Sequence, residues 1–159
     1  MERLREVLAF VNHKGGVGKT TTVQSLAAGL RIYSRGKFGV DADGRKRLPR
    51  VLIIDRDPQA CASFLFGWSE TQNMGKPTVY DAMVQQSNLP VYRVREGIYL
   101  APASSRLISI EPFLNQRAVP RKVLYRLLAK PLNEMSGTEP ADEGLTTVTE
   151  AFDYVLLDC

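Results

Sequence analysis

A glycine-rich stretch with two lysines, residues 12–21 (NHKGGVGKTT), carries the residue types that bind phosphate. It follows an apolar run and precedes a helical pattern, so we expect it at a strand-to-helix turn. Glycines let the backbone curl until its N–H groups point inward, at the positive end of the following helix. Lys19 can reach the β- and γ-phosphates of a nucleotide, and the Thr20 hydroxyl can ligate Mg²⁺. The stretch therefore predicts a binding site for a nucleoside triphosphate.

Two carboxylates follow a second apolar run, in residues 51–59 (VLIIDRDPQ). Ligands of doubly wound sheets collect at the carboxyl ends of the strands, so we expect both carboxylates beside the glycine-rich loop. Asp55 can hold a Mg²⁺-bound water there. Asp57 can position or activate an attacking water.

A third apolar run ends in aspartate, in residues 152–159 (FDYVLLDC). A carboxylate at the end of a buried strand is typical of a Walker B box, and Asp158 would complete the Mg²⁺ shell through water. Asp41 and Asp43 also follow an apolar residue, but the run before them is short and broken by glycine. We expect residues 41–44 to form a turn and not a metal site.

Strand-like and helix-like patterns alternate along the chain. Strands are expected at residues 7–11, 51–54, 92–94, 98–100 and 152–157, and helices at residues 19–34, 58–66, 78–86, 108–116 and 119–130. The first strand is apolar on both faces, as a central parallel strand requires. The two strands around Gly97 suggest a hairpin. This alternation predicts an α/β fold with a mostly parallel sheet covered by helices on both faces. Residues 36–49 and 131–148 are expected to be loop insertions.

Composition limits the alternatives. The 159 residues suffice for one domain, and the 44% hydrophobic and 24% charged residues are those of a globular protein. The net charge of +4 permits contact with nucleic acid without requiring it. Cys61 and Cys159 have no metal or disulfide spacing, which fits a reducing compartment. No signal peptide or membrane span is visible, so we expect a soluble cytoplasmic protein.

The motifs resemble those of a known family. Residues 14–20 (KGGVGKT) match the deviant Walker A box of the ParA/MinD class of P-loop ATPases, and residues 55–59 (DRDPQ) are similar to the ParA-type D-x-D-P-Q box. Arg56 stands where members of that family usually carry an apolar residue. The resemblance is closest to the ParA (Soj-like) plasmid and chromosome partition proteins. It implies a three-layer αβα P-loop NTPase fold for residues 1–159, truncated after the strand that carries Asp158.

The resemblance also implies roles for named residues. The nucleotide-binding positions would be Lys14, Gly15, Gly16, Val17, Gly18, Lys19, Thr20 and Thr21. The metal-binding positions would be Thr20, Asp55 and Asp158, and the catalytic residues would be Lys14 and Asp57. In this class the extra lysine reaches across a nucleotide-sandwich homodimer to the ATP of the partner. Asp57 would have the hydrolytic role.

A cycle of Mg²⁺-ATP binding, dimerisation, non-specific DNA binding and slow hydrolysis follows from the same resemblance. The stimulating partner would be a ParB-like centromere-binding protein, the process plasmid or chromosome partition, and the location the cytoplasm, on the nucleoid if DNA binding is retained. No membrane contact is implied. The resemblance covers nearly all of the chain but only the N-terminal half of a family member. A sheet that ends in its last strand would expose an unpaired edge there.

Three alternatives remain open or are disfavoured. A MinD-like division-site ATPase usually lacks Pro-Gln in the second box and carries a C-terminal amphipathic membrane helix, which is absent here. Nitrogenase iron-protein relatives need cluster-bridging cysteines that this chain does not supply in their pattern. A truncated, non-catalytic nucleotide-binding or dimerisation module remains possible.

Further expectations concern residues outside these motifs. His13 is assigned to backbone conformation and not to catalysis. Cys61 is assigned to packing as a small residue and not to reactivity. The basic residues of the last helical stretch suggest a solvated outer face in preference to a DNA contact; they are Arg117, Arg121, Lys122, Arg126 and Lys130.

Overall fold

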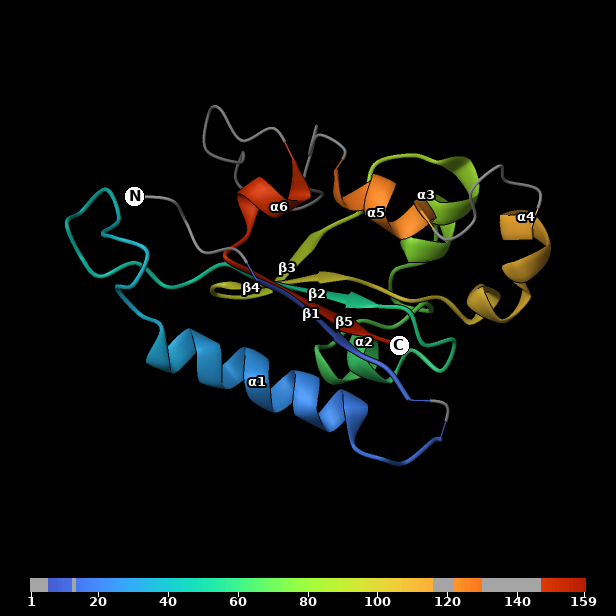
Figure 1. The fold of residues 1–159 in the computed structure, drawn as a ribbon, viewed down its shortest axis with the longest axis horizontal. Coiled ribbons are helices and arrows are strands. Elements are labelled where there is room, and N and C mark those ends of the chain that lie inside the picture. Colours follow the sequence, from blue (N-terminus) through green and yellow to red (C-terminus); the bar gives the residue numbers. More distant parts are fainter. Residues whose placement is uncertain (1–5, 13, 116–121, 130–146) are drawn as a thin grey trace.

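One sheet of five strands organises the chain, in the order β1-β5-β2-β4-β3. This computed structural model describes residues 6–12, 14–115, 122–129 and 147–159 (Figure 1). The strands are β1 (Glu6–Phe10), β2 (Val51–Asp55), β3 (Tyr92–Arg95), β4 (Ile98–Ala101) and β5 (Tyr154–Asp158). β1, β5, β2 and β4 are parallel, and β3 pairs antiparallel with β4. The mostly parallel sheet and the hairpin around Gly97 are thus confirmed.

The last strand, β5, lies between β1 and β2. Its residues pair with β1 from Glu6↔Tyr154 to Phe10↔Asp158 and with β2 from Val51↔Tyr154 to Asp55↔Asp158. The expectation that the last strand forms the open edge is therefore wrong, because β5 is hydrogen-bonded on both sides.

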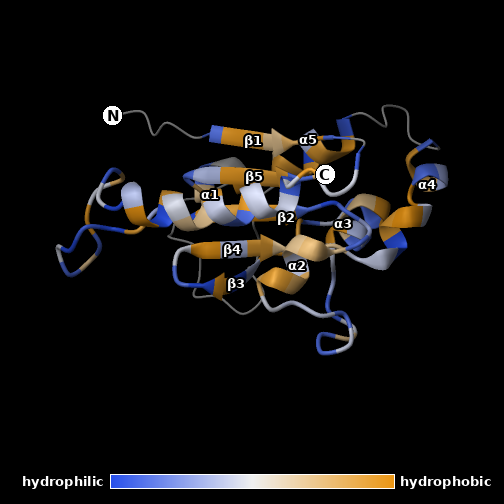
Figure 2. Ribbon diagram, turned by 90° about the horizontal axis from the view of Figure 1, so that it is seen from below, coloured by the Kyte–Doolittle hydropathy of each residue, from blue (hydrophilic) through white to orange (hydrophobic). Residues whose placement is uncertain are grey.

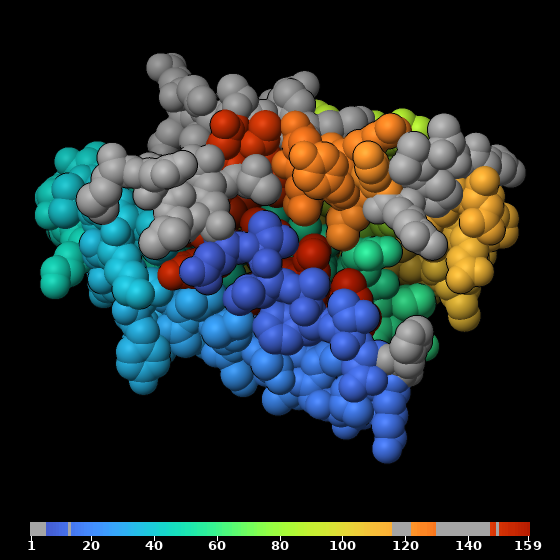
Figure 3. All heavy atoms as spheres, in the orientation of Figure 1, coloured from blue at the N-terminus to red at the C-terminus, as the bar shows by residue number. Residues whose placement is uncertain are grey.

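The open edge among the described strands is β1, which pairs with β5 alone. The expectation that the first strand is central is also wrong here. Its side chains reflect this position, since Val7 is 46% exposed and Leu8 37% exposed, and the blue atoms of this segment lie on the surface in Figure 3. On one side, no strand of the described part of the chain pairs with β1, so one row of its backbone groups has no strand partner there.

Helices cover both faces of the sheet, which confirms the three-layer arrangement (Figure 1). The α-helices are α1 (Lys19–Tyr33), α2 (Cys61–Leu65), α3 (Val79–Gln85), α4 (Glu111–Asn115), α5 (Val123–Leu128) and α6 (Val148–Ala151), and η1 (Ser105–Ser109) is a 3-10 helix. α1 and α2 lie on one side of the sheet, and α3, α5 and α6 lie on the other.

Alternation along β2 and β5 divides the apolar core into two halves. Leu52 and Ile54 point to the α3, α5 and α6 side, whereas Val51 and Ile53 point to the side of α1. Every residue of β2 and β5 is buried, as strands covered on both faces require. Figure 2 shows the corresponding hydrophobic colouring along the strands.

α1 matches the helix expected at residues 19–34. Val23 and Ala27 are fully buried against the sheet, and Leu26 and Leu30 pack partly buried beside them. The helix starts at the carboxyl end of β1 and runs back over the sheet to the amino ends of the strands. Its 15 residues span about 22 Å at the usual rise per residue.

The other helices are shorter than expected. α2 occupies the middle of the stretch predicted at 58–66, while α3 fills residues 79–85 of the predicted 78–86. Thr78 and Asp81 form a capping box that fixes the start of α3. The helix predicted at 108–116 is divided between η1 and α4, and α5 covers part of the helix predicted at 119–130.

The two predicted loops differ in outcome. Residues 36–49 form an excursion with one isolated bridge between Val40 and Lys46, and the Asp41 side chain accepts hydrogen bonds from the N–H groups of Asp43 and Arg45. The turn at 41–44 is confirmed. Most of the loop predicted at 131–148 lies outside the described residues, and its last position, Val148, already belongs to α6. None of the described helices has the length and apolar character needed to cross a bilayer.

Candidate functional site

The glycine-rich loop joins β1 to α1, as expected. Gly16 has a φ of +71°, and Gly18, at the N-cap of α1, has a φ of +85°. Residues other than glycine rarely adopt these values. A Cβ at either position would meet nothing within 4 Å, so the backbone conformation and not space requires glycine here. α1 begins without a side-chain cap and with no acidic residue in its first turn. Its first N–H groups are therefore available to an anion.

The two loop lysines sit differently. Lys19 donates from Nζ to the carbonyl oxygen of Asn12 at 3.2 Å, which holds its ammonium over the loop. The backbone N–H of Lys14 donates to Asn12 Oδ1 at 3.0 Å, and the Lys14 side chain is exposed. Asn12 thus organises both lysines. His13 lies outside the described residues.

Thr20 and Asp158 meet at the foot of the loop. Thr20 Oγ1 donates to Asp158 Oδ2 at 2.7 Å, which joins the start of α1 to the end of β5. The other carboxylate oxygen, Asp158 Oδ1, is buried and has no hydrogen-bond partner among the described residues. Burial is the main cause that raises the pKa of Asp158, and the nearby charge of Asp57 raises it further, whereas Thr20 and Lys19 act in the opposite direction.

A cation would suit this position. An unpaired buried carboxylate oxygen is costly and calls for a ligand or water, and a hydroxyl with a carboxylate is the oxygen donor set that Mg²⁺ prefers. No group of three or more His, Cys, Asp or Glu side chains gathers for metal binding within the described residues. Any Mg²⁺ would thus depend on phosphate oxygens and water for its remaining ligands, as it does in nucleotide sites.

Asp55 is placed differently from the expectation for a metal ligand. Its carboxylate is fully buried, and Oδ2 accepts hydrogen bonds from both the backbone N–H and the hydroxyl of Ser63 at 2.7 Å. Oδ1 accepts from the N–H of Asp57 at 3.1 Å. Burial raises the pKa of Asp55 to about 6, against the lowering effect of the Ser63 hydrogen bonds. Protein donors surround this carboxylate, and its part in holding a metal-bound water stays a prediction.

Asp57 opens onto the cavity in front of the loop. Its Oδ1 accepts from the N–H of Gln59 at 2.9 Å, and its carbonyl oxygen accepts from the N–H of Ala60 at 2.8 Å. Ala60 takes the left-handed conformation, with a φ of 52°, which is strained for a residue with a Cβ. This tight turn presents a half-buried carboxylate across from the glycine-rich loop.

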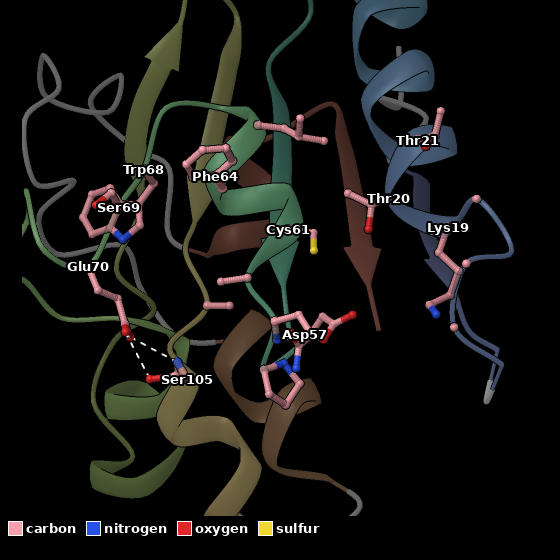
Figure 4. Close-up of a pocket in the computed structure, with 18 of the residues that line it drawn as sticks. Lys19, Thr20, Thr21, Asp57, Cys61, Phe64, Trp68, Ser69, Glu70 and Ser105 are labelled. Atoms are coloured by element: carbon pink, nitrogen blue, oxygen red, sulfur yellow. Dashed lines mark hydrogen bonds between the residues drawn. The ribbon is translucent and has the colours of Figure 1, made fainter.

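The cavity between these elements has a volume of about 900 Å³, within the range of small-molecule sites. Figure 4 shows Lys19 and Thr20 on one side of it and Asp57 with α2 on the other. The glycine-rich loop, the turn after β2 and the segment after α2 supply most of its lining: Gly15–Thr21, Asp57–Cys61, Phe64, Leu65, Trp68–Thr71, Ala103 and Ser105. All predicted site residues from Gly15 to Thr21, and Asp57, face this one space.

Three residues at or beside the cavity have contacts or exposure that the sequence did not predict. Ser63 is fully buried and connects Asp55 to the backbone N–H of Ala103, to which its Oγ is an acceptor at 2.9 Å. Trp68 packs on Tyr92 with ring centroids 4.3 Å apart and lines the cavity. Cys61 is exposed beside the cavity, so the expectation of a small packed residue is wrong. Nothing in the sequence distinguishes Ser63 from other serines, so its contact with Asp55 could not be predicted.

Comparison with known proteins gives a family match over almost the whole chain. The AAA domain family matches residues 5–159. The chain is 31% identical over 156 residues to the chromosome partitioning protein ParA of Caulobacter vibrioides, an alignment that covers 96% of this chain and 47% of that protein. The chain spans about half the length of the first relatives that it matches.

Solved structures give the same fold. Cobyrinic acid a,c-diamide synthase from Mycobacterium smegmatis, solved with ADP and magnesium, superposes with a TM-score of 0.69 at 31% identity, over 97% of this chain and 50% of that one. An ATP complex of a McdA variant from Cyanothece has a TM-score of 0.70 at 24% identity, over 99% of this chain and 48% of that one, and shows the fold alone.

Proposed function

The chain belongs to the AAA domain family, as the N-terminal half of a ParA-type P-loop ATPase, and on this premise we propose that it binds Mg²⁺-ATP in the cavity at the glycine-rich loop. The observation that carries the proposal is the Thr20–Asp158 pair, which brings a hydroxyl and a buried carboxylate together at the N-terminus of α1. One similar protein supports the choice of ligand, since the cobyrinic acid a,c-diamide synthase was solved with ADP and magnesium and also with an ATP analogue and magnesium.

Each part of the cavity has a role in this proposal. The open N–H groups at the start of α1, with Lys19, bind the phosphates. Thr20 and Asp158 hold Mg²⁺, which supplies positive charge to the phosphate oxygens. Asp57 stands across the cavity from the loop and orients the attacking water. Lys14, exposed at the rim of the loop, reaches the nucleotide of a second copy in a sandwich homodimer.

The likeness to the Caulobacter chromosome partitioning protein supports a role in plasmid or chromosome partition. For that role we propose an ATPase that dimerises with ATP, binds DNA without sequence preference and responds to a ParB-like partner. The alternative is a nucleotide-binding or dimerisation module without turnover. The exposed edge of β1 favours this alternative, because the open edge among the described strands is a surface for pairing with another chain.

Calorimetric titration of Mg²⁺-ATP into the 159-residue chain tests the proposal, with phosphate release measured on the same samples. The decisive variant is Lys19→Ala. Lys122→Ala is the matched control, because Lys122 is an exposed lysine at the N-cap of α5, away from the cavity. Circular dichroism of all three proteins establishes that they are equally folded.

Saturable binding that is lost in Lys19→Ala and retained in Lys122→Ala is the expected result. Equal affinity in all three proteins would contradict the assignment of the glycine-rich loop as the phosphate site. Binding without phosphate release would favour the non-catalytic module.

A further inference from the structure

Arg56 lines a second pocket, on the opposite face of the sheet from the nucleotide cavity. This pocket has a volume of about 530 Å³, within the range of small-molecule sites. The turn after β2, α3, α4 and α5 line it, whereas the glycine-rich loop leads into α1 on the other face (Figure 1). Among the described residues, the two spaces share no lining residue. The second pocket is therefore a site of its own.

The guanidinium of Arg56 has no opposite charge beside it. The backbone N–H of Arg56 donates to Asp158 O at 2.8 Å, which fixes the residue just after β2. Its Nε is buried without a hydrogen-bond partner among the described residues, and none of their carboxylates forms an ion pair with it. Burial raises the pKa of the nearby Cys159 thiol, against the lowering effect of Arg56, so this thiol is neutral at pH 7. A buried cationic donor without an acceptor is costly, and an anion in the pocket would satisfy it.

Apolar side chains supply most of the remaining lining. Met83 of α3 and Val123 of α5 are buried in the core on this face of the sheet. Leu114 of α4 and Leu124 of α5 pack against that core and remain half-buried. An apolar group placed against these side chains would leave water, and each buried methylene would strengthen binding by about fourfold. The pocket therefore suits a ligand with an apolar body.

The other polar residues of the lining limit the charge of that ligand. Glu111 and Asn115 both belong to α4 and are exposed. The Glu111 carboxylate would repel a second negative charge, so the lining disfavours a phosphate dianion or a polyanion. A single carboxylate matches the one cation of the pocket, because its two oxygens accept two parallel hydrogen bonds from a guanidinium.

We propose that this pocket binds a small monocarboxylate with an apolar tail, the carboxylate on the Arg56 guanidinium and the tail against Met83 and Leu124. Arg56 stands where the ParA-type box usually has an apolar residue, so the site belongs to this chain and not to the family in general. It does not depend on the proposed nucleotide binding, because Arg56 does not line the nucleotide cavity.

Calorimetric titration of octanoate into the 159-residue chain, without nucleotide, tests the proposal. Three further probes separate charge from tail: octan-1-ol has the tail without the charge, butanoate has the charge with a shorter tail, and inorganic phosphate has charge alone. The test variant is Arg56→Leu, which places an apolar residue in the box. The matched control is Arg126→Leu, because Arg126 is an exposed arginine of α5 that does not line the pocket. Circular dichroism compares the folding of the three proteins.

Octanoate should bind saturably to the unmutated chain and at least tenfold more weakly to Arg56→Leu, which lacks the charge-assisted hydrogen bonds. Octan-1-ol should be weaker than octanoate by a similar factor, and butanoate should lose at least tenfold with its shorter tail. Arg126→Leu should change the affinity for octanoate by less than about twofold. Absence of octanoate binding would overturn the proposal, as would equal affinity for octan-1-ol, tighter binding of phosphate, or equal effects of the two substitutions.

NMR of methionine methyl groups locates the bound octanoate in the unmutated chain, so this readout holds even if Arg56→Leu does not fold. Met83 lines this pocket and not the nucleotide cavity, while Met74 lines neither and is 85% exposed. In the chain labelled with ¹³C-methyl methionine, octanoate should shift the Met83 signal and leave the Met74 signal in place. An unshifted Met83 signal at saturating octanoate would assign the binding to another site and overturn the proposal.

Discussion

Thr20 Oγ1 and Asp158 Oδ2 lie 2.7 Å apart although 138 positions separate the two residues in the chain. The hydrogen bond connects the first turn of α1 to the end of β5, which lies between β1 and β2. It also orients the carboxylate, whose second oxygen remains buried without a partner among the described residues. The hydroxyl and the carboxylate therefore act as one unit, and variants of either should fail together.

Thr20→Ala should abolish the Mg²⁺ dependence of nucleotide binding, since it removes the hydroxyl that faces Asp158. Thr20→Ser keeps the hydroxyl and should retain the dependence. Calorimetric titrations of ATP with and without Mg²⁺ measure the difference. If Thr20→Ala responds to Mg²⁺ as the unmutated chain does, the pair has no part in metal binding.

Lys14→Ala should bind Mg²⁺-ATP with nearly unchanged affinity and lose hydrolysis in the full-length protein. A cation that stabilises transition-state charge in trans contributes about 10³–10⁵ in rate in well-studied cases. Phosphate release by Lys14→Ala is compared with that by Lys122→Ala, which alters an exposed lysine outside the cavity. Unchanged turnover would remove Lys14 from the reaction.

Asp57→Ala should leave an ATP-bound state that does not turn over, because Asp57 is the carboxylate that opens onto the cavity. Asp43→Ala is the control, since Asp43 is an exposed aspartate of the 36–49 loop. The full-length protein is assayed for ATP-dependent dimerisation by light scattering and for phosphate release. Normal release by Asp57→Ala would transfer the water-handling role elsewhere.

Asp55 should make the free energy of unfolding depend on pH. Its pKa is raised from 3.8 to about 6 by burial, so the folded chain holds a proton that the unfolded chain has released between these values. On account of this group, stability is highest below about pH 4 and falls as the pH rises to about 6. The free energy of unfolding falls by about 3 kcal/mol in total, since each unit by which the pKa is raised corresponds to about 1.4 kcal/mol.

The comparison with Asp55→Asn isolates this effect. Denaturant unfolding at pH 4, 5, 6 and 7 measures the free energy of unfolding of both proteins. As the pH rises, the unmutated chain should lose stability relative to Asp55→Asn. A constant difference across this range would mean that the Asp55 pKa is not raised.

Ser63→Ala should destabilise the fold by about 2–3 kcal/mol, because it removes the hydroxyl that donates to Asp55 and accepts from the N–H of Ala103. Both groups would be left buried without that partner. Ser109→Ala, at an exposed serine, should change the stability by less than about 0.5 kcal/mol. Urea unfolding at pH 7 measures both variants, and equal effects would contradict the bridging role of Ser63.

Local sequence patterns were enough to predict the elements of this site. The local features are the glycines of the loop, which take positive φ in the structure, the helical spacing of Val23 and Ala27, and an apolar run before each aspartate. They correctly predicted α1, β2, β5, the hairpin and a layered α/β fold. The meeting of Thr20 with Asp158 follows from the same reasoning, since parallel strands end at one edge of a sheet.

Strand order and side-chain partners could not be predicted in this way. An apolar run such as β1 has the same sequence pattern whether it lies inside a sheet or at its edge. The edge position of β1 is seen only in the structure, where β5 pairs with both β1 and β2. The sequence placed both Asp55 and Asp57 beside the glycine-rich loop, the first for a metal-bound water and the second for an attacking water. Only the tertiary contact with Ser63 buries the first and leaves the second open to the cavity.

The position of β5 has a consequence for how the chain acquires its fold. β1 and β2 each pair with β5 and not with one another, so the two strands that carry the glycine-rich loop and Asp55 have no common partner until residues 154–158 arrive. Assembly of the sheet must therefore wait until residues 154–158 have left the ribosome. Such distant pairing folds slowly and exposes apolar strands in the meantime, which makes the nascent segment a natural client of chaperones.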